Sequence, residues 1–377
     1  MRLFFTCTEL GLGHVQRAIQ LGKKLQKREH EIHFSSGGVA YKLLKKEFKN
    51  VYPCTPVGWY ENAHGVIPSA SLLNIFTPLP WYDYERRKLR IKTPSSKETI
   101  HRYYDLRKHM LEIKPDIIIS DGDIVSLRLA KKWKIPAIYI TNIIRPSYRF
   151  SSILTPGERI TERYVKKCVK IIVPDNPKFT ICEYNLGDLD QLGIREKVEL
   201  VGSFLTMKRE KGSEKFLFAP ISGPLGTRAK LAKMVIPVLS SLKTESIVSL
   251  GEPGSKSVKK FGNCEVHGWL NVKQRKECMK NARTIIFSGG HGTCFEVIKQ
   301  GKPSICIPTQ PEQMANARKL DKLKCSIYVE NKGQLKSAIE EIETKKDFYK
   351  NNAEKIHNYS SRFQGLNRAV TVIENAL

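Results

Sequence analysis

Short runs of branched apolar residues alternate with longer amphipathic stretches along the first half of the chain, and this alternation constrains the fold most. The apolar runs fall at 2–7, 31–35, 116–120, 136–141 and 170–173. The amphipathic stretches include 15–28, 99–113 and 124–133. Apolar runs without polar alternation are typical of strands that helices cover on both faces. The pattern therefore predicts a doubly wound α/β domain with a parallel sheet.

The same alternation restarts at residue 215, which predicts a second domain of the same kind. Strands are expected at 215–219, 245–250, 284–287 and 304–307, with helices at 227–241, from 294 and from 312. We therefore place an N-terminal domain at 1–202, a polar linker at 203–214 and a C-terminal domain at 215–357. The stretch 345–376 predicts one or two helices, and a helix within 358–377 is expected to pack back on the N-terminal domain.

Residues 56–98 break the alternation with five prolines, and they predict a long loop or insertion with short helices. The run 72–82 gathers Leu72, Leu73, Ile75, Phe76, Leu79, Trp81 and Tyr82, and it is followed by Arg86, Arg87, Lys88, Arg90 and Lys92. Such a segment inserts at an anionic membrane interface or packs on the first domain as a covered loop. The sequence leaves both alternatives open.

Lysine and arginine number 64 against 37 aspartates and glutamates, which gives a net charge of +27. This charge favours anionic partners, which include nucleic acid, phosphates and acidic lipid surfaces. The bases are scattered from Arg2 to Arg368, so we expect a basic globular surface and not a disordered arm.

Nine cysteines, an odd number without a C-x-x-C pair, indicate reduced thiols and a reducing cytosol. The opening residues are too soon interrupted to resemble a signal peptide, and no run approaches the roughly 18 apolar residues of a transmembrane helix. We therefore expect a cytoplasmic protein that binds at most peripherally to the cytoplasmic face of a membrane.

The first predicted strand is followed by Gly11-Leu-Gly13-His14, which opens a helix. Glycines allow a ligand to approach the backbone, and a helix N-terminus offers free amides to an anion. A dinucleotide-binding fingerprint would need a third glycine where Gln16 or Arg17 stands, so no NAD site is expected. An imidazole at this place can act as a general base, or His14 merely satisfies loop carbonyls.

Asp121 lies at the carboxyl end of the predicted strand 116–120, immediately before Gly122-Asp123. An aspartate at a strand end commonly caps the next helix. Two aspartates two residues apart also have the D-x-D spacing of a metal-binding pair. The two-sheet organisation argues against that interpretation.

In the second domain, a glycine-rich turn joins strand 284–287 to the next helix. Its residues are Ser288, Gly289, Gly290, His291, Gly292, Thr293 and Glu296. Consecutive amides in such a turn form a nest that suits a diphosphate. Thr293 and Glu296 also have the spacing of a capping box, which would explain those two residues structurally. A weaker glycine turn, at Gly223, follows strand 215–219.

Polar side chains begin the helix that is expected from 312. Glu312, Gln313 and Asn316 fall at its start, beside the same strand edge, where they can bind sugar hydroxyls. In this order, the run 288–317 resembles the donor-binding region of nucleotide-sugar glycosyltransferases of the GT-B fold. Gly11-Leu-Gly13-His14 resembles their acceptor-side loop. The closest likeness is to family 28, typified by the peptidoglycan N-acetylglucosaminyltransferase, and within it to archaeal members.

The resemblance implies an α/β fold of the GT-B type, with two Rossmann-like doubly wound domains facing a central cleft. By the same resemblance, the turn 288–293 holds the donor diphosphate, Glu296 takes ribose hydroxyls, and Glu312 and Gln313 take the transferred sugar. Gly223 lines the phosphate side, and Gly13 is a further donor-binding residue. Trp269 stacks on uracil from the loop 267–270, which includes Leu270. His14 is the base and Asp121 orients it.

The implied function is an inverting, metal-independent transfer from a UDP-sugar to a hydroxyl of a lipid-linked or membrane-lipid acceptor. No cofactor, no metal and no nucleic acid are expected; a UDP-sugar and an anionic membrane surface are the expected partners. Three alternatives remain: a GT-B UDP-sugar epimerase, a binding subunit whose activity needs a membrane partner, and a non-enzymatic basic nucleic-acid-binding protein. The last would explain the charge of +27 but not the glycine turns.

Overall fold

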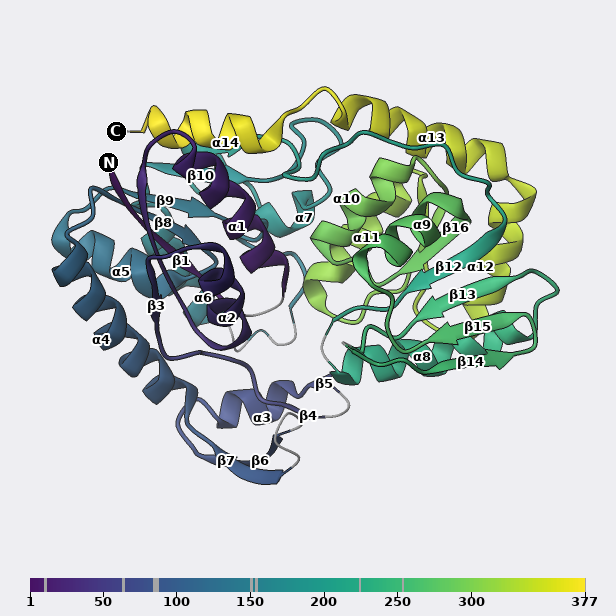
Figure 1. The fold of residues 1–377 in the computed structure, drawn as a ribbon, viewed down its shortest axis with the longest axis horizontal. Coiled ribbons are helices and arrows are strands. Elements are labelled where there is room, and N and C mark those ends of the chain that lie inside the picture. The colour runs from purple at the N-terminus through teal and green to yellow at the C-terminus, as the bar shows by residue number, and fades with distance from the viewer. Residues whose placement is uncertain are drawn as a thin grey trace.

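The computed structural model of the chain contains two seven-stranded sheets, each covered by helices (Figure 1). It describes residues 1–9, 12–62, 65–83, 88–149, 152, 155–223, 225–252 and 254–376. Gly11, Arg86 and Arg87 of the predicted motifs lie outside these residues.

The first sheet has the strand order β11-β10-β9-β8-β1-β2-β3, and all its neighbouring pairs are parallel. Its strands are β1 (Arg2–Cys7), β2 (Glu31–Ser36), β3 (Val51–Pro53), β8 (Ile117–Asp121), β9 (Ala137–Ile140), β10 (Lys170–Val173) and β11 (Val198–Leu200). The accompanying helices are α1 (Leu12–Gln26), α2 (Gly38–Glu47), α4 (Ser95–Ile113), α5 (Ile124–Trp133), α6 (Thr155–Val165) and the short α7 (Glu183–Leu186). The strand order reverses between β1 and β8, so the carboxyl ends of these two strands form the crevice where open α/β sheets bind ligands.

The second sheet has the order β14-β15-β13-β12-β16-β17-β18. Its strands are β12 (Phe216–Pro220), β13 (Ser246–Ser249), β14 (Val258–Phe261), β15 (Cys264–His267), β16 (Ala282–Phe287), β17 (Ser304–Cys306) and β18 (Ser326–Tyr328). Its helices are α8 (Leu225–Ser240), α9 (Val272–Asn281), α10 (His291–Gln300), α11 (Pro311–Lys322) and α12 (Lys332–Thr344). The sheet is parallel as predicted except at one edge, where β14 pairs antiparallel with β15 through a tight turn.

The C-terminal region forms two helices, α13 (Lys346–Ser360) and α14 (Gly365–Glu374). The expected domain limit at 357 therefore falls inside α13. Helix α14 crosses to the first domain and lies beside α1 (Figure 1), where Ala369, Val370 and Ile373 join the buried cluster that α1 forms with the first sheet. Residues 201–215, which include the expected linker, form no helix or strand.

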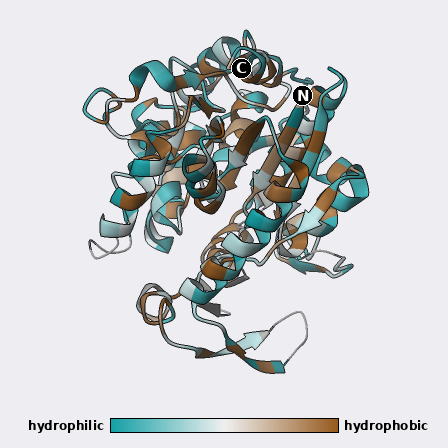
Figure 2. Ribbon diagram, turned by 90° about the vertical axis from the view of Figure 1, so that its left-hand side faces the viewer, coloured by the Kyte–Doolittle hydropathy of each residue, from teal (hydrophilic) through white to brown (hydrophobic). Residues whose placement is uncertain are grey.

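The insertion 56–98 contains more regular structure than its prolines predict. It forms the short strand pair β4 (Glu61–Asn62) and β5 (Gly65–Val66), helix α3 (Pro68–Leu73), and a hairpin of β6 (Leu79–Asp83) and β7 (Lys88–Lys92). The expectation of loop with short helices is therefore wrong for both strand pairs. The hairpin tolerates Pro80 because a two-stranded ribbon leaves half of its backbone groups outside the ladder. Figure 2 shows that α3 and the hairpin protrude from the body of the molecule.

Candidate active site between the two domains

His14, Asp121 and Arg17 form a hydrogen-bonded cluster at the carboxyl ends of β1 and β8. The Nδ1 of His14 lies 2.6 Å from Oδ1 of Asp121. Arg17, one turn along α1, donates from Nη2 to the same oxygen at 2.6 Å and from Nε to Oδ2 at 3.1 Å. The neighbouring strands β1 and β8 bring the cluster together, because Cys7 is the register partner of Asp121.

Asp121 is completely buried, yet its surroundings favour the carboxylate. Burial alone would raise the pKa of Asp121, but the positive charge of Arg17 and the interactions with His14 outweigh burial and hold the pKa below its ordinary value. An ionised carboxylate can only accept hydrogen bonds, so Nδ1 of His14 must carry the proton. The second ring nitrogen of His14, Nε2, then has a free lone pair, which a general base requires.

These contacts decide between the structural alternatives for the two residues. The alternative of a helix cap for Asp121 is wrong, because Asp123 caps α5 by accepting from the backbone N–H of Val125 at 3.1 Å. His14 is bound by a carboxylate and not only by loop carbonyls. Gly122 lies against the imidazole: its φ is +73°, and a Cβ there would come 3.2 Å from Cε1 of His14. A side chain at this position would therefore strain the backbone and crowd the imidazole.

A second buried ion-pair network, which no sequence motif predicted, supports this edge of the sheet. Arg102 of α4 donates to Asp123 Oδ2 at 3.0 Å and to Glu9 Oε2 at 3.2 Å. Burial raises the pKa of Glu9 although Arg102 opposes the shift. The network ties the loop after β1 to the start of α5, and so fixes the surroundings of His14.

Apart from Gly13, which lies in α1 of the first domain, the predicted donor residues follow carboxyl ends of strands in the second sheet. Gly223 follows β12, Trp269 follows β15, Ser288 follows β16 and Glu312 follows β17. They therefore lie on one edge of that sheet. Trp269 is exposed, as stacking on a base would require, whereas the side chain of its neighbour Leu270 is buried in the apolar core.

The glycine turn differs from its predicted form at the start of the helix. Helix α10 begins at His291, not at 294, with Gly290 as its N-cap. Thr293 is therefore inside the first turn, and the predicted capping box with Glu296 does not form. Glu296 instead pairs with Arg275 of α9 at 2.6 Å. The earlier start places the backbone amides that follow Gly290 at the helix N-terminus, where they have no partner in the preceding turn.

The three glycines of the turn have different surroundings. Gly289 has a φ of +83°, and a Cβ there would lie 2.7 Å from Sγ of Cys306. A Cβ at Gly290 or Gly292 would meet nothing within 4 Å. Gly13 is likewise open, and Gly223 has a φ of +110°. Gly289 is thus required by the fold, while Gly290 and Gly292 leave open space beside the amides.

The three predicted polar residues of α11 have different surroundings: Gln313 and Asn316 are buried, whereas Glu312 is bound by a residue of the first domain. Gln313 is buried and accepts from the backbone N–H and the hydroxyl of Thr309, both at 2.9 Å. Asn316 is completely buried and donates to the carbonyl of Gly289 at 2.9 Å. Asn316 therefore holds the glycine turn in this structure, and its contact with the sugar stays a prediction.

Glu312 links the second domain to the first. Its Oε1 accepts from Nδ2 of Asn142 at 2.8 Å, and Asn142 follows β9 at the sheet edge that carries Asp121. The negative charge of Glu312 also acts on Arg17, whose pKa is raised mainly because Asp121 outweighs the effect of burial. Asn142 and Arg17 were missed as site residues, since neither belongs to a local motif. The structure brings Glu312 toward the His14 cluster.

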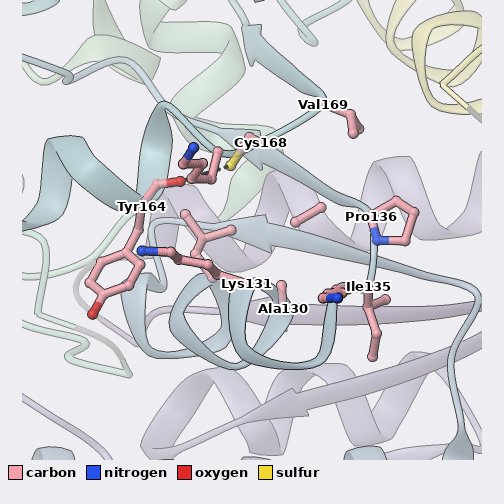
Figure 3. A pocket seen from close by; sticks show the side chains of 11 residues that line it. Ala130, Lys131, Ile135, Pro136, Tyr164, Cys168 and Val169 are labelled. Carbon is pink, nitrogen blue, oxygen red and sulfur yellow. Dashed lines mark hydrogen bonds between the residues drawn. The ribbon is translucent and has the colours of Figure 1, made fainter.

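A pocket of about 310 Å³ lies elsewhere on the first domain, between α5, the end of α6 and the starts of β9 and β10 (Figure 3). Its lining includes Lys131, Pro136, Tyr164, Cys168 and Val169. Pro136 and Val169 immediately precede β9 and β10, whereas Asp121 ends β8. Because these strands are parallel, the pocket is at the opposite end of the sheet from the His14 cluster.

Comparison with known proteins agrees with this architecture. Residues 242–368 match the model of the glycosyltransferase family 28 C-terminal domain. Two relatives, uncharacterized glycosyltransferases of Methanosarcina acetivorans and Methanosarcina mazei, are 26% and 25% identical, and each alignment covers 84% of this chain and 82% of the relative.

Two solved structures illustrate the likeness of fold. The calicheamicin glycosyltransferase has a TM-score of 0.70 at 14% identity, over 100% of this chain and 98% of its own. MurG of Acinetobacter baumannii has a TM-score of 0.63 at 14% identity, over 99% of each chain. These likenesses confirm the predicted fold class: two parallel-sheet α/β domains in the GT-B arrangement.

Proposed function

We propose that this chain, a family 28-like glycosyltransferase of the GT-B fold, transfers a sugar from a UDP-sugar to a hydroxyl of a lipid-linked or membrane-lipid acceptor, with inversion and without a metal. The observation that carries the proposal is the cluster of His14, Asp121 and Arg17 at one face of the domain interface, with Glu312 of the other domain turned toward it. A base and a donor site on opposite domains suit a transfer between two bound molecules.

The first step is deprotonation of the acceptor hydroxyl by Nε2 of His14. As the imidazole gains a proton, the carboxylate of Asp121, 2.6 Å from Nδ1, stabilises the new positive charge. Arg17 keeps Asp121 ionised and fixes its orientation through two hydrogen bonds. The activated oxygen attacks the anomeric carbon from the face opposite the diphosphate, which inverts the configuration.

The leaving diphosphate needs positive charge, and the glycine turn offers it without a cation. The N-terminus of α10 carries roughly half a positive elementary charge from its aligned peptide dipoles. The first amides of a helix have no acceptor within the helix itself, and the open space at Gly290 and Gly292 admits a phosphate. Preorganised amides of this kind stabilise charge that develops in a transition state. This argument supports a metal-independent reaction.

The case for a membrane acceptor rests on the protruding hairpin. Directly opposed residues of an antiparallel pair share a face, so Pro80, Tyr82, Leu89 and Ile91 lie on one face of β6 and β7. Leu89 and Ile91 are 70% and 65% exposed, and Phe76 nearby is 81% exposed. Lys88 and Arg90 alternate with Leu89 and Ile91 along β7 and lie on the opposite face of the hairpin. Exposed apolar groups with cations on the same strand suit an anionic lipid surface. In the part of the chain that the structure describes, no helix has the length and apolarity to cross a bilayer.

The test is release of UDP from a UDP-sugar panel in the presence of a crude lipid extract. The expected result is UDP release that depends on the extract, persists in EDTA, and gives a product whose anomeric configuration is opposite to that of the donor. Retention of configuration, or a requirement for a divalent cation, would contradict the corresponding part of the proposal. A UDP-sugar epimerase would instead change the donor sugar without accumulating UDP in step with a lipid product.

A further inference from the structure

Asp175 and His291 meet in the buried interface between the two domains. Asp175 follows β10 at the carboxyl edge of the first sheet, and His291 is the first residue of α10 in the second domain. The Nε2 of His291 lies 3.1 Å from Oδ2 of Asp175, and both side chains are buried. The contact joins the glycine turn to the opposite domain.

Both oxygens of Asp175 are already engaged by its own domain. Oδ1 accepts from the backbone N–H of Asn176 at 2.7 Å and of Ile181 at 3.2 Å. Oδ2 accepts from the backbone N–H of Cys182 at 2.8 Å. The carboxylate therefore fixes the loop 175–182. The same backbone hydrogen bonds hold the carboxylate itself in place, so it offers the imidazole of His291 an acceptor in a fixed position.

The same segment makes further contacts with the second domain. Asn176 donates to Oγ of Ser360 in α13 at 2.7 Å. Asn185 donates to Oδ1 of Asn316 in α11 at 3.2 Å, and Asn316 in turn binds the carbonyl of Gly289 at 2.9 Å. The glycine turn is thus held at two points by the first domain: through Asn316 at Gly289 and directly at His291.

A metal site is the competing interpretation, because ligand atoms of Asp175, Cys182 and His291 all lie within 4.8 Å of one another. With no metal bound, burial raises the pKa of the Cys182 thiol well above its ordinary value. Metal ions bind the thiolate, and the carboxylate oxygens are already occupied by backbone amides. The cluster therefore fits a hydrogen-bonded contact between the domains better than a metal site.

We propose that Asp175 and His291 are positioning residues that hold the donor turn 288–293 in its diphosphate-binding form from across the domain interface. The inference rests on the proposed function. A turn with glycines at 289, 290 and 292 has much conformational freedom in its backbone. An amide nest stabilises charge only when its amides are already oriented. His291 supplies a buried side-chain anchor within this stretch, and Asp175 supplies the fixed point.

The test compares His291→Phe with His291→Gln by calorimetric titration of UDP. Phenylalanine keeps the edge-to-face packing of the His291 ring on Phe295, whose centroids are 5.3 Å apart, but it removes the N–H. Glutamine loses the ring but returns an N–H at a similar reach. We expect a roughly tenfold weaker UDP affinity for the Phe variant, as for loss of one charge-assisted hydrogen bond, and an affinity within about threefold of wild type for the Gln variant.

Steady-state kinetics distinguish a positioning role from a merely structural role. The KM for the UDP-sugar should rise in His291→Phe and in Asp175→Asn, while the KM for the acceptor stays unchanged. The double variant should lose little more than either single one, because the two groups act as one unit. If His291→Phe fails to fold, Asp175→Asn, which keeps the size of the side chain, decides the matter.

The outcomes separate this inference from the proposed function. Wild-type protein that binds no nucleoside diphosphate would overturn both. Wild-type protein that binds UDP, with equal affinity in the folded His291→Phe and Asp175→Asn variants, would overturn the positioning role alone. Failure of His291→Gln to retain affinity would do the same. Stoichiometric zinc binding that is lost in Cys182→Ser would show a metal site instead.

Discussion

Nδ1 of His14 lies 2.6 Å from Oδ1 of Asp121, although 107 residues separate them in the chain. Asp121 ends β8, and His14 lies in the first turn of α1, which follows the neighbouring strand β1 where the strand order of the first sheet reverses. The contact engages Nδ1 of His14, so Nε2 is the ring nitrogen that could accept a proton from a substrate. The pair therefore has the arrangement in which a carboxylate sets the tautomer and orientation of a histidine base.

The first prediction concerns His14 itself. His14→Ala should lower kcat by roughly 10²–10⁴-fold with little change in UDP affinity, because a general base acts on the acceptor and not on the donor. Steady-state kinetics and calorimetry would check it. His101→Ala, which removes an exposed histidine from α4, is the matched control and should behave as wild type. Wild-type turnover of the His14 variant would leave the imidazole with a structural role only.

The second prediction is a pH dependence of stability that originates at Asp121. The pKa of this carboxyl in the folded state is below its ordinary value of 3.8, because Arg17 and His14 outweigh its burial. Its contribution to stability is therefore complete above pH 3.8 and is lost as the pH falls through the lower folded-state pKa. Asp121→Asn, which leaves Arg17 buried without its partner, should destabilise the protein by about 3 kcal/mol at pH 7.

Urea unfolding of the wild type and of Asp121→Asn across a pH series would measure this difference. The gap between the two proteins should narrow at acidic pH, since the wild-type carboxyl becomes neutral there and resembles the amide. Glu47→Gln, which changes a surface carboxylate paired with Lys23, is a control that should show a small effect. A gap that stayed constant with pH would mean that the charge of Asp121 contributes nothing.

The periodic features of the sequence predicted the fold well, because strand and helix periods follow from local pattern alone. Helix α5 occupies the predicted residues 124–133, and β1 occupies 2–7. The hairpin of β6 and β7 was missed because Pro80 and the clustered aromatic residues hide its alternation. The start of α10 was placed three residues late, since glycines at 289, 290 and 292 disfavour a helix locally while the N-cap geometry of Gly290 begins one.

The candidate site was predictable only where motifs are local. The sequence indicated His14 and Glu312 through their positions after strands. Arg17 and Asn142 carry no such signal, because their partners lie 104 and 170 residues away and only tertiary structure joins them. Asn316 was assigned to the sugar from its helical spacing, but burial directs its amide to Gly289.

A third prediction separates two glycines of the donor turn. Gly289→Ala should destabilise the fold, because its φ of +83° is unfavourable for alanine and the new methyl would lie 2.7 Å from the sulfur of Cys306. Gly290→Val should leave thermal unfolding unchanged and abolish UDP binding, because nothing in the protein lies within 4 Å of its Cβ and the methyl groups would occupy the expected phosphate position. Calorimetry and thermal melts distinguish the two effects. Retained UDP affinity in folded Gly290→Val would place the diphosphate elsewhere.

A fourth prediction concerns Asn142 and the transferred sugar. Asn142 donates to Glu312 at 2.8 Å, so Asn142→Ala should release the carboxylate and raise the KM of the UDP-sugar by about tenfold without weakening the binding of UDP alone. Asn142→Asp keeps the shape but places a second carboxylate beside Glu312. Two such carboxylates share a proton more readily at low pH, so this variant should be less impaired at pH 6 than at pH 8. Equal effects on UDP and on the UDP-sugar would show that Glu312 does not contact the sugar.

The last prediction tests whether the protruding hairpin binds a membrane. The structure shows which residues of the hairpin should be substituted in the test. Trp81 is opposite Arg90 on one face of the hairpin and is partly buried, whereas Leu89 and Ile91 lie on the other face and are 70% and 65% exposed. An apolar face of this kind, next to cations, should insert at the interface while the cations meet anionic head groups, each contributing about 1 kcal/mol.

Sedimentation with liposomes measures the association. The wild type should bind vesicles that contain anionic lipid in a salt-sensitive manner and bind neutral vesicles weakly. Leu89→Ser combined with Ile91→Ser should weaken the binding at unchanged thermal stability, because both side chains are largely exposed in the free protein. Val272→Ser, at an exposed valine that begins α9 on the second domain, is the matched control and should bind as wild type. If the double variant binds anionic vesicles like wild type, the hairpin is not the membrane contact; if wild type ignores such vesicles at low salt, the acceptor is to be sought among soluble molecules.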